Sequence, residues 1–88
     1  MIFNIGDLKK KIIYRSTYRG TKEMDALISS FTKQIINDLN EDELINLSNL
    51  LDIDDENLYK FNQGLSPTVE IEKNKVSKLF KEFKYNKE

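Results

Sequence analysis

The residues best suited to chemistry lie in one short stretch and are Arg19, Gly20, Glu23 and Asp25. Two carboxylates that flank one bond can act as a general acid and a general base. On a helix, however, residues i and i+2 point about 200° apart, so Glu23 and Asp25 cannot serve one bond. Arg19 and Glu23 are four residues apart, but Gly20 interrupts the helix between them and an ordinary helical ion pair is not expected. We therefore interpret these carboxylates as contacts, with favourable charge in a first helical turn, and not as catalysts.

Gly20 allows two interpretations, which the residues alone leave open. It can form a turn that needs a positive φ, or it can mark a place where a partner's backbone approaches so closely that a Cβ would clash. Tyr14, Arg15 and Tyr18 lie close to Gly20 in the sequence and are expected near the same turn. Tyrosine and arginine are favoured at protein interfaces. We expect one tyrosine to pack on the fold, and we assign Arg15 and Tyr18 to partner binding.

The composition excludes several classes of protein. The 88 residues contain no histidine and no cysteine, which removes the usual zinc sites, disulfides and the Ser-His or Cys-His nucleophiles. No apolar run approaches the roughly 20 residues of a membrane span. The first residues, which include Asp7, do not read as a signal peptide. We expect a cytoplasmic, non-enzymatic protein that does not insert into a membrane.

The segments that position the turn at Gly20 are predicted to be helices. The first helix is capped by Asp7, and its apolar stripe reaches Ser16 before Gly20 interrupts it. The second begins at about Lys22 and has the clearest 3.6-residue period. Its apolar stripe consists of Met24, Leu27, Ile28, Phe31, Ile35 and Leu39.

Three further helices follow. Asn40 and Glu43 have the spacing of a capping box, which opens the third helix. We interpret the acidic residues 54–56 as the N-terminal cap of a short fourth helix and not as a calcium site. Gly64 is expected to end that helix. Pro67 is expected in the first turn of the fifth helix. The apolar stripes of the third, fourth and fifth helices are Leu44, Leu47, Leu50 and Leu51; Leu58 and Phe61; and Val76, Leu79, Phe80 and Phe83.

These segments predict the fold class. Short connectors between five helices, without any internal repeat or strand-like alternation, indicate an all-α five-helix bundle. A chain of this size has room for one core, so we expect a single domain over residues 1–88. Residues after Tyr85 are expected to fray.

Charge falls into three blocks along the chain. Residues 7–22 are mostly basic, residues 38–56 are acidic without any Lys or Arg, and residues 73–87 are rich in lysine. The blocks can be solvated faces that attract one another within the fold, or the first block can face an acidic partner. Nucleic acid is not expected as a partner, because no aromatic-interleaved basic motif accompanies the lysines.

The stretch from Arg19 to Asp25 resembles the RGxxE(x)D signature of the succinate dehydrogenase assembly factors, which promote covalent FAD attachment to the flavoprotein subunit. Residues 12–16, which precede this motif, resemble the apolar-apolar-Tyr-x-Ser sequence that precedes it in the family. Residues 54–59 resemble its DDxxL-aromatic segment. The chain departs from the pattern at Thr17-Tyr18, where many members carry basic residues, and at Phe61, where tryptophan is frequent.

The resemblance implies a helper that binds the free flavoprotein subunit of succinate dehydrogenase, with that of fumarate reductase as a further candidate. FAD would be held by that partner, and this chain would bind no cofactor stably. The family's motif positions correspond here to Arg19, Gly20 and Glu23, with Asp25 beside them. By this resemblance, Gly20 would let the partner's backbone approach closely and Arg19 would form a charge-assisted bond to the partner. The two carboxylates would make polar contacts. We expect a monomer when the chain is free. The alternative is an antitoxin-type or other regulatory protein-binding module.

Overall fold

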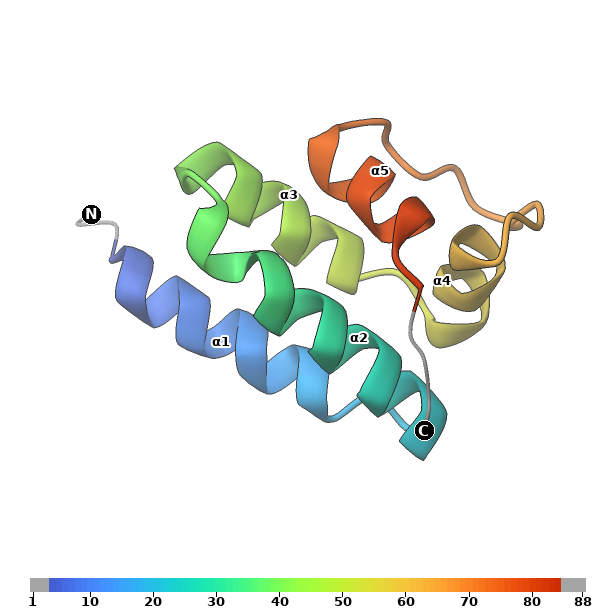
Figure 1. Ribbon diagram of the computed structural model, residues 1–88, viewed down its shortest axis with the longest axis horizontal. Helices are drawn as coiled ribbons and strands as arrows, with labels where there is room; N and C mark the ends of the chain where they lie inside the picture. Colours follow the sequence, from blue (N-terminus) through green and yellow to red (C-terminus); the bar gives the residue numbers. More distant parts are fainter. Residues whose placement is uncertain (1–3, 85–88) are drawn as a thin grey trace.

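The computed structural model describes residues 4–84. Within that range the chain forms five α-helices, one 3₁₀ turn and no strand, which confirms the prediction of a small all-α bundle. The expected fraying after Tyr85 concerns residues outside this range. The elements are α1 (Ile5–Thr17), α2 (Lys22–Ile35), η1 (Ile36–Asp38), α3 (Glu41–Leu51), α4 (Asp55–Asn62) and α5 (Lys75–Glu82). In Figure 1, α1 and α2 lie side by side as an antiparallel pair, α5 lies beside α3, and α4 follows the end of α3 and contacts α5.

The apolar stripes form one buried cluster. Every residue of the predicted stripe from Met24 to Leu39 is buried, as are all four predicted leucines of α3. Phe31 of α2 packs against Phe80 of α5 with ring centroids 5.0 Å apart. Burial of these side chains is the main favourable term for folding, and α2 supplies six buried residues to this cluster or beside it, more than any other helix.

Side chains that cap the helices set most of the helix starts. Asn40 and Glu43 exchange bonds with each other's backbone N–H groups, so the predicted capping box of α3 is confirmed. Asp54 caps α4, also as predicted. The prediction of Asp7 as the first cap is wrong. Asn4 accepts the N–H of Asp7 at 3.1 Å, so α1 begins earlier and Asp7 lies in its first turn.

Gly64 ends α4 as predicted. Its φ is +78°, a conformation in which a Cβ is disfavoured. The N–H of Leu65 donates to the carbonyl of Lys60 at 2.8 Å, and that of Gly64 donates to Phe61 at 3.3 Å. These two bonds form a Schellman motif, which satisfies the last carbonyls of α4.

The fifth helix begins later than expected, so the placement of Pro67 in its first turn is wrong. Residues 65–74 form an irregular crossing from α4 to α5, which Figure 1 shows passing over the end of the bundle. A hydrogen bond fixes Thr68 within this crossing: its N–H donates to the side-chain oxygen of Asn57 at 2.7 Å. The helix starts only where Asn74 and Ser77 form a second capping box. That local signal is stronger than the preference of proline for a first turn.

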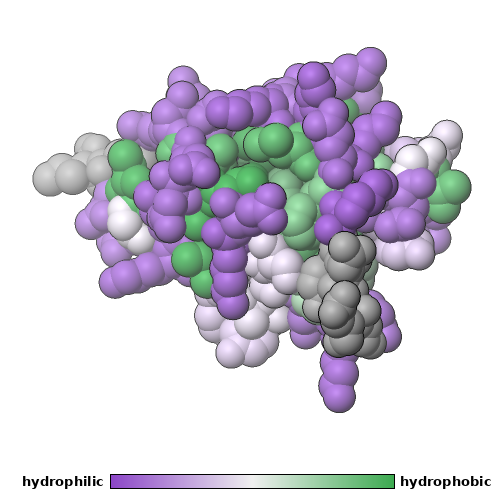
Figure 2. All heavy atoms as spheres, viewed as in Figure 1, coloured by the Kyte–Doolittle hydropathy of each residue, from purple (hydrophilic) through white to green (hydrophobic). Residues whose placement is uncertain are grey.

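The face drawn in Figure 2 is mostly polar, with hydrophilic side chains around a central group of apolar ones. Among the helices of residues 4–84, none has the length and apolar character needed to cross a membrane.

Candidate functional site: the turn between α1 and α2

The candidate site is the connection between the first two helices, residues 18–21, which we call the RG turn. Helix α1 ends at Thr17, and the N–H of Tyr18 still donates to the carbonyl of Tyr14 at 3.3 Å. Helix α2 begins after Thr21, whose hydroxyl accepts the N–H of Met24 at 3.1 Å. Each of these two helix ends therefore has a capping hydrogen bond from its own segment. The two residues between the caps, Arg19 and Gly20, make the bend.

The bend is closed from inside by Asp25. Its Oδ1 accepts the backbone N–H of Arg19, and that of Gly20 at 3.4 Å. Gly20 has φ = +155°, which residues with a Cβ rarely adopt. This confirms the interpretation of Gly20 as a turn that needs a positive φ. Gly20 is also exposed, so its outer side is open to the approach of another chain.

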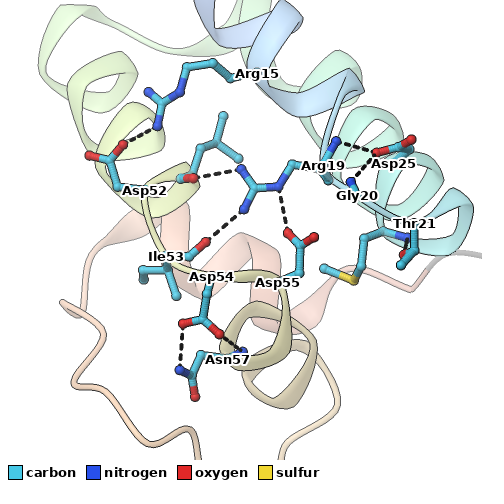
Figure 3. Close-up of polar contacts among 12 residues, drawn as sticks. Arg15, Arg19, Gly20, Thr21, Asp25, Asp52, Ile53, Asp54, Asp55 and Asn57 are labelled. Atoms are coloured by element: carbon cyan, nitrogen blue, oxygen red, sulfur yellow. Dashed lines mark hydrogen bonds and ion pairs between the residues drawn. The ribbon is translucent and has the colours of Figure 1, made fainter.

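The side chain of Arg19 turns inward. Its Nε donates to Asp55 Oδ1 at 2.8 Å, and its terminal nitrogens donate to the carbonyls of Leu51 at 2.7 Å and Ile53 at 2.8 Å. Only 11% of the side chain is exposed. Figure 3 shows the guanidinium between these three acceptors, at the corner where α3 ends and α4 begins. We call this set of bonds the Arg19 clip.

The second arginine is also used within the chain. Arg15 donates to the hydroxyl of Ser48 at 3.0 Å and forms an ion pair with Asp52. Both guanidinium groups fasten the first helical pair to the α3–α4 corner, and the assignment of Arg15 and Arg19 to partner binding stays a prediction. The physical reason is local, because the carbonyl end of a helix favours a nearby cation.

The side chains that point outward are different ones. Tyr14 and Tyr18 are 66% and 69% exposed and contact each other, with ring centroids 4.8 Å apart. The expectation that one tyrosine packs on the bundle is wrong, because both side chains are mostly exposed, Tyr14 within α1 and Tyr18 at its C-cap. Glu23 is exposed in the first turn of α2. We call Tyr14, Tyr18, Gly20, Thr21 and Glu23 the outer face of the RG turn.

Glu23 also borders a hollow between α2 and α4. The hollow has a volume of about 410 Å³, with Met24 and Leu27 as its apolar lining and Tyr59 and Lys84 at its edge. The hollow is open to solvent and is not an enclosed cavity.

Asp54 and Asp55 have separate tasks although they are adjacent. The side-chain amide and the backbone N–H of Asn57 both donate to Asp54, and these bonds lower the pKa of its carboxyl. Asp54 therefore caps α4, and the next carboxylate is available to Arg19.

The sequence alone does not identify Asp55 and Asp52 as the partners of the two arginines. The available signal was the opposition between the basic block at residues 7–22 and the acidic block at residues 38–56. That opposition indicated attraction within the fold, but it did not identify which pairs would form. The assignment of Tyr18, Gly20, Glu23 and Asp25 to partner binding stays a prediction, with Asp25 bound to the turn's own backbone.

The fold and the site together define a class of protein: a small helical bundle with one apolar core and an exposed turn that is bonded to the rest of the chain from its inner side. The chain belongs to the family described as flavinator of succinate dehydrogenase, whose family model matches residues 10–84.

Two curated relatives are similar over nearly the whole chain. Both are named succinate dehydrogenase assembly factor 2, mitochondrial. The protein from Danio rerio is 30% identical over 91% of this chain, and the protein from Debaryomyces hansenii is 34% identical over 93%. The chain spans 52% and 61% of their respective lengths. The relatives are named as mitochondrial, so the expected cytoplasmic location stays a prediction. No solved structure matches the chain.

Proposed function

We propose that this protein is an assembly factor that binds the flavoprotein subunit of succinate dehydrogenase and promotes covalent attachment of FAD to it. The family match over residues 10–84 is the observation that carries the proposal. The names of the relatives point to the same enzyme complex.

The outer face of the RG turn supports a docking role. An exposed pair of tyrosines is the kind of anchor that contributes most of the binding energy at protein interfaces. Gly20 beside it presents backbone without a side chain, and Glu23 supplies a charge at the start of α2. A partner segment can therefore meet aromatic surface, bare backbone and a carboxylate within one short stretch.

We propose that the partner, and not this chain, holds the FAD. Arginine is the residue best suited to bind the pyrophosphate of a dinucleotide. The only two arginines of the sequence are engaged with Asp52 and Asp55. Since the FAD is attached to the flavoprotein subunit in this proposal, the attachment residue belongs to the partner. The contribution of this protein is then to hold the partner in a reactive arrangement, which is catalysis by positioning.

The test is to produce the flavoprotein subunit with and without this chain and to measure flavin fluorescence of the denatured subunit. We expect covalent flavin to increase when the chain is present. A Glu23→Gln variant should reduce that increase. Glu41→Gln is the matched control, because Glu41 is also an exposed glutamate in the first turn of a helix but lies at the start of α3.

Equal covalent flavin with and without the wild-type chain would contradict the proposal. Recovery of a toxin or a nucleic acid as the main partner in a pull-down would instead favour the regulatory alternative.

A further inference from the structure

We infer that Asp55 is a positioning residue for docking: through Arg19 it holds the RG turn in the shape that a partner recognises. The inference rests on the proposed function, and it concerns how the outer face is kept in place. Neither the arginine nor this aspartate then needs to touch the partner.

The geometry places the Asp55 carboxylate against both residues of the bend. One oxygen lies 2.8 Å from Arg19 Nε. The other would lie 3.4 Å from a Cβ built on Gly20. Because Asp54 caps α4, the Asp55 side chain is not required for that task. It lies at the first position of α4, where the N-terminal dipole favours a carboxylate.

The clip joins parts of the chain that are distant in sequence. Arg19 is 32 residues from Leu51 and 36 residues from Asp55, and its planar guanidinium bonds three acceptors in a fixed arrangement. The backbone N–H of the same residue is bonded to Asp25. The turn is thus held on its inner side by the α3–α4 corner and by the first turn of α2.

Holding the turn matters for binding because an ordered loop loses less conformational entropy when a partner docks. The outer-face residues Gly20, Thr21 and Glu23 follow directly on Arg19 along the chain. Loosening the clip therefore weakens docking even where the helical bundle stays folded.

The neighbouring pair provides a matched control. Asp52 binds Arg15, which lies within α1 and not in the turn. An alanine at position 52 removes an ion pair at the same corner without releasing Arg19. Asp55→Ala and Asp52→Ala therefore separate loss of the clip from loss of a charge at this corner.

The experiment measures the affinity of the purified flavoprotein subunit for each variant, at a temperature where circular dichroism shows all of them folded. We expect Asp55→Ala to weaken binding about tenfold and Asp52→Ala to change it by less than about twofold. Asp55→Asn, which keeps an oxygen acceptor without the charge, should fall between them. Hydrogen exchange of the Arg19 and Gly20 amides should accelerate in Asp55→Ala but not in Asp52→Ala.

A double variant shows whether Asp55 acts through the turn. If it does, Asp55→Ala and Glu23→Gln together should weaken binding by less than the product of their separate effects. If Asp55→Ala binds as tightly as Asp52→Ala, or if its effect simply multiplies with that of Glu23→Gln, the inference is overturned while the proposed function stands. If the wild-type chain does not bind the flavoprotein subunit at all, the proposed function itself fails.

Discussion

A guanidinium taken out of water in a small domain needs several acceptors at once, because a buried donor without a partner is costly. Arg19 meets this requirement with one carboxylate and two backbone carbonyls, and only 11% of its side chain remains exposed. Arg15 is more exposed, at 35%, and its partner Asp52 is 67% exposed. The two arginines of the chain therefore contribute very differently to stability, although they are four residues apart on the same segment.

Arg19→Ala should lower the free energy of unfolding by about 2 to 3 kcal/mol, because it leaves two carbonyls and a carboxylate without their donor. Arg15→Ala serves as the matched comparison and should cost about 1 kcal/mol or less, as expected for an exposed pair. Urea unfolding of both variants measures the difference. Equal losses would show that the Arg19 clip is no stronger than a surface ion pair.

Gly20→Ala should destabilise the protein by about 1 to 3 kcal/mol, because φ = +155° is strained for any residue with a Cβ. Gly64→Ala is the control: its φ is +78°, nothing lies within 4 Å of the added Cβ, and it ends α4 and is not part of the RG turn. It should cost about 1 kcal/mol by the same mechanism. Urea unfolding measures both, and binding of the flavoprotein subunit should weaken only for Gly20→Ala.

At the scale of the helices, local signals predicted most of the structure. The apolar stripe from Met24 to Leu39 and the leucines of α3 follow from periodicity alone, because one face of each helix must be buried. The start of α5 did not follow. Proline at position 67 is compatible with a first helical turn, but the contact between Thr68 and Asn57 holds the chain in an irregular crossing. A bond between residues eleven positions apart is not visible as a sequence period.

Asn74→Ala should lower the free energy of unfolding by about 1 kcal/mol, because Asn74 is the cap that starts α5. Asn49→Ala, at an exposed position within α3, is the control and should be neutral or slightly stabilising, since alanine is the better helix former. The urea midpoints of the two variants measure the effect. A neutral Asn74→Ala would mean that α5 is positioned by packing alone.

Across the whole molecule, the basic and acidic blocks meet inside the fold. The first block supplies Arg15 and Arg19, and the acidic block supplies Asp52 and Asp55. The sequence indicated this attraction and located the bend at Gly20. It could not show that Arg19 points inward, because the direction of a long side chain depends on acceptors that only the tertiary fold brings near.

Stability should fall in acid. Asn40 and Lys75 lower the pKa of Glu43, and Asn57 lowers the pKa of Asp54, so the folded state binds fewer protons than the unfolded state. Their stabilising contribution is present above the ordinary values of 4.5 and 3.8 and is lost as the pH falls through the lowered ones. Urea unfolding across this range should show a smaller slope against pH for Glu43→Gln. An unchanged slope would mean that Glu43 does not contribute.

The most direct test of docking at the RG turn is the affinity of the purified flavoprotein subunit for a variant in which Tyr14 and Tyr18 are both serine. We expect binding to weaken about a hundredfold, because exposed aromatic anchors carry much of the energy of an interface. Ile45→Ser, at an apolar position of α3 that is 40% exposed, should bind as the wild type does. If the double-tyrosine variant also binds like the wild type, the outer face of the RG turn is not where the partner docks.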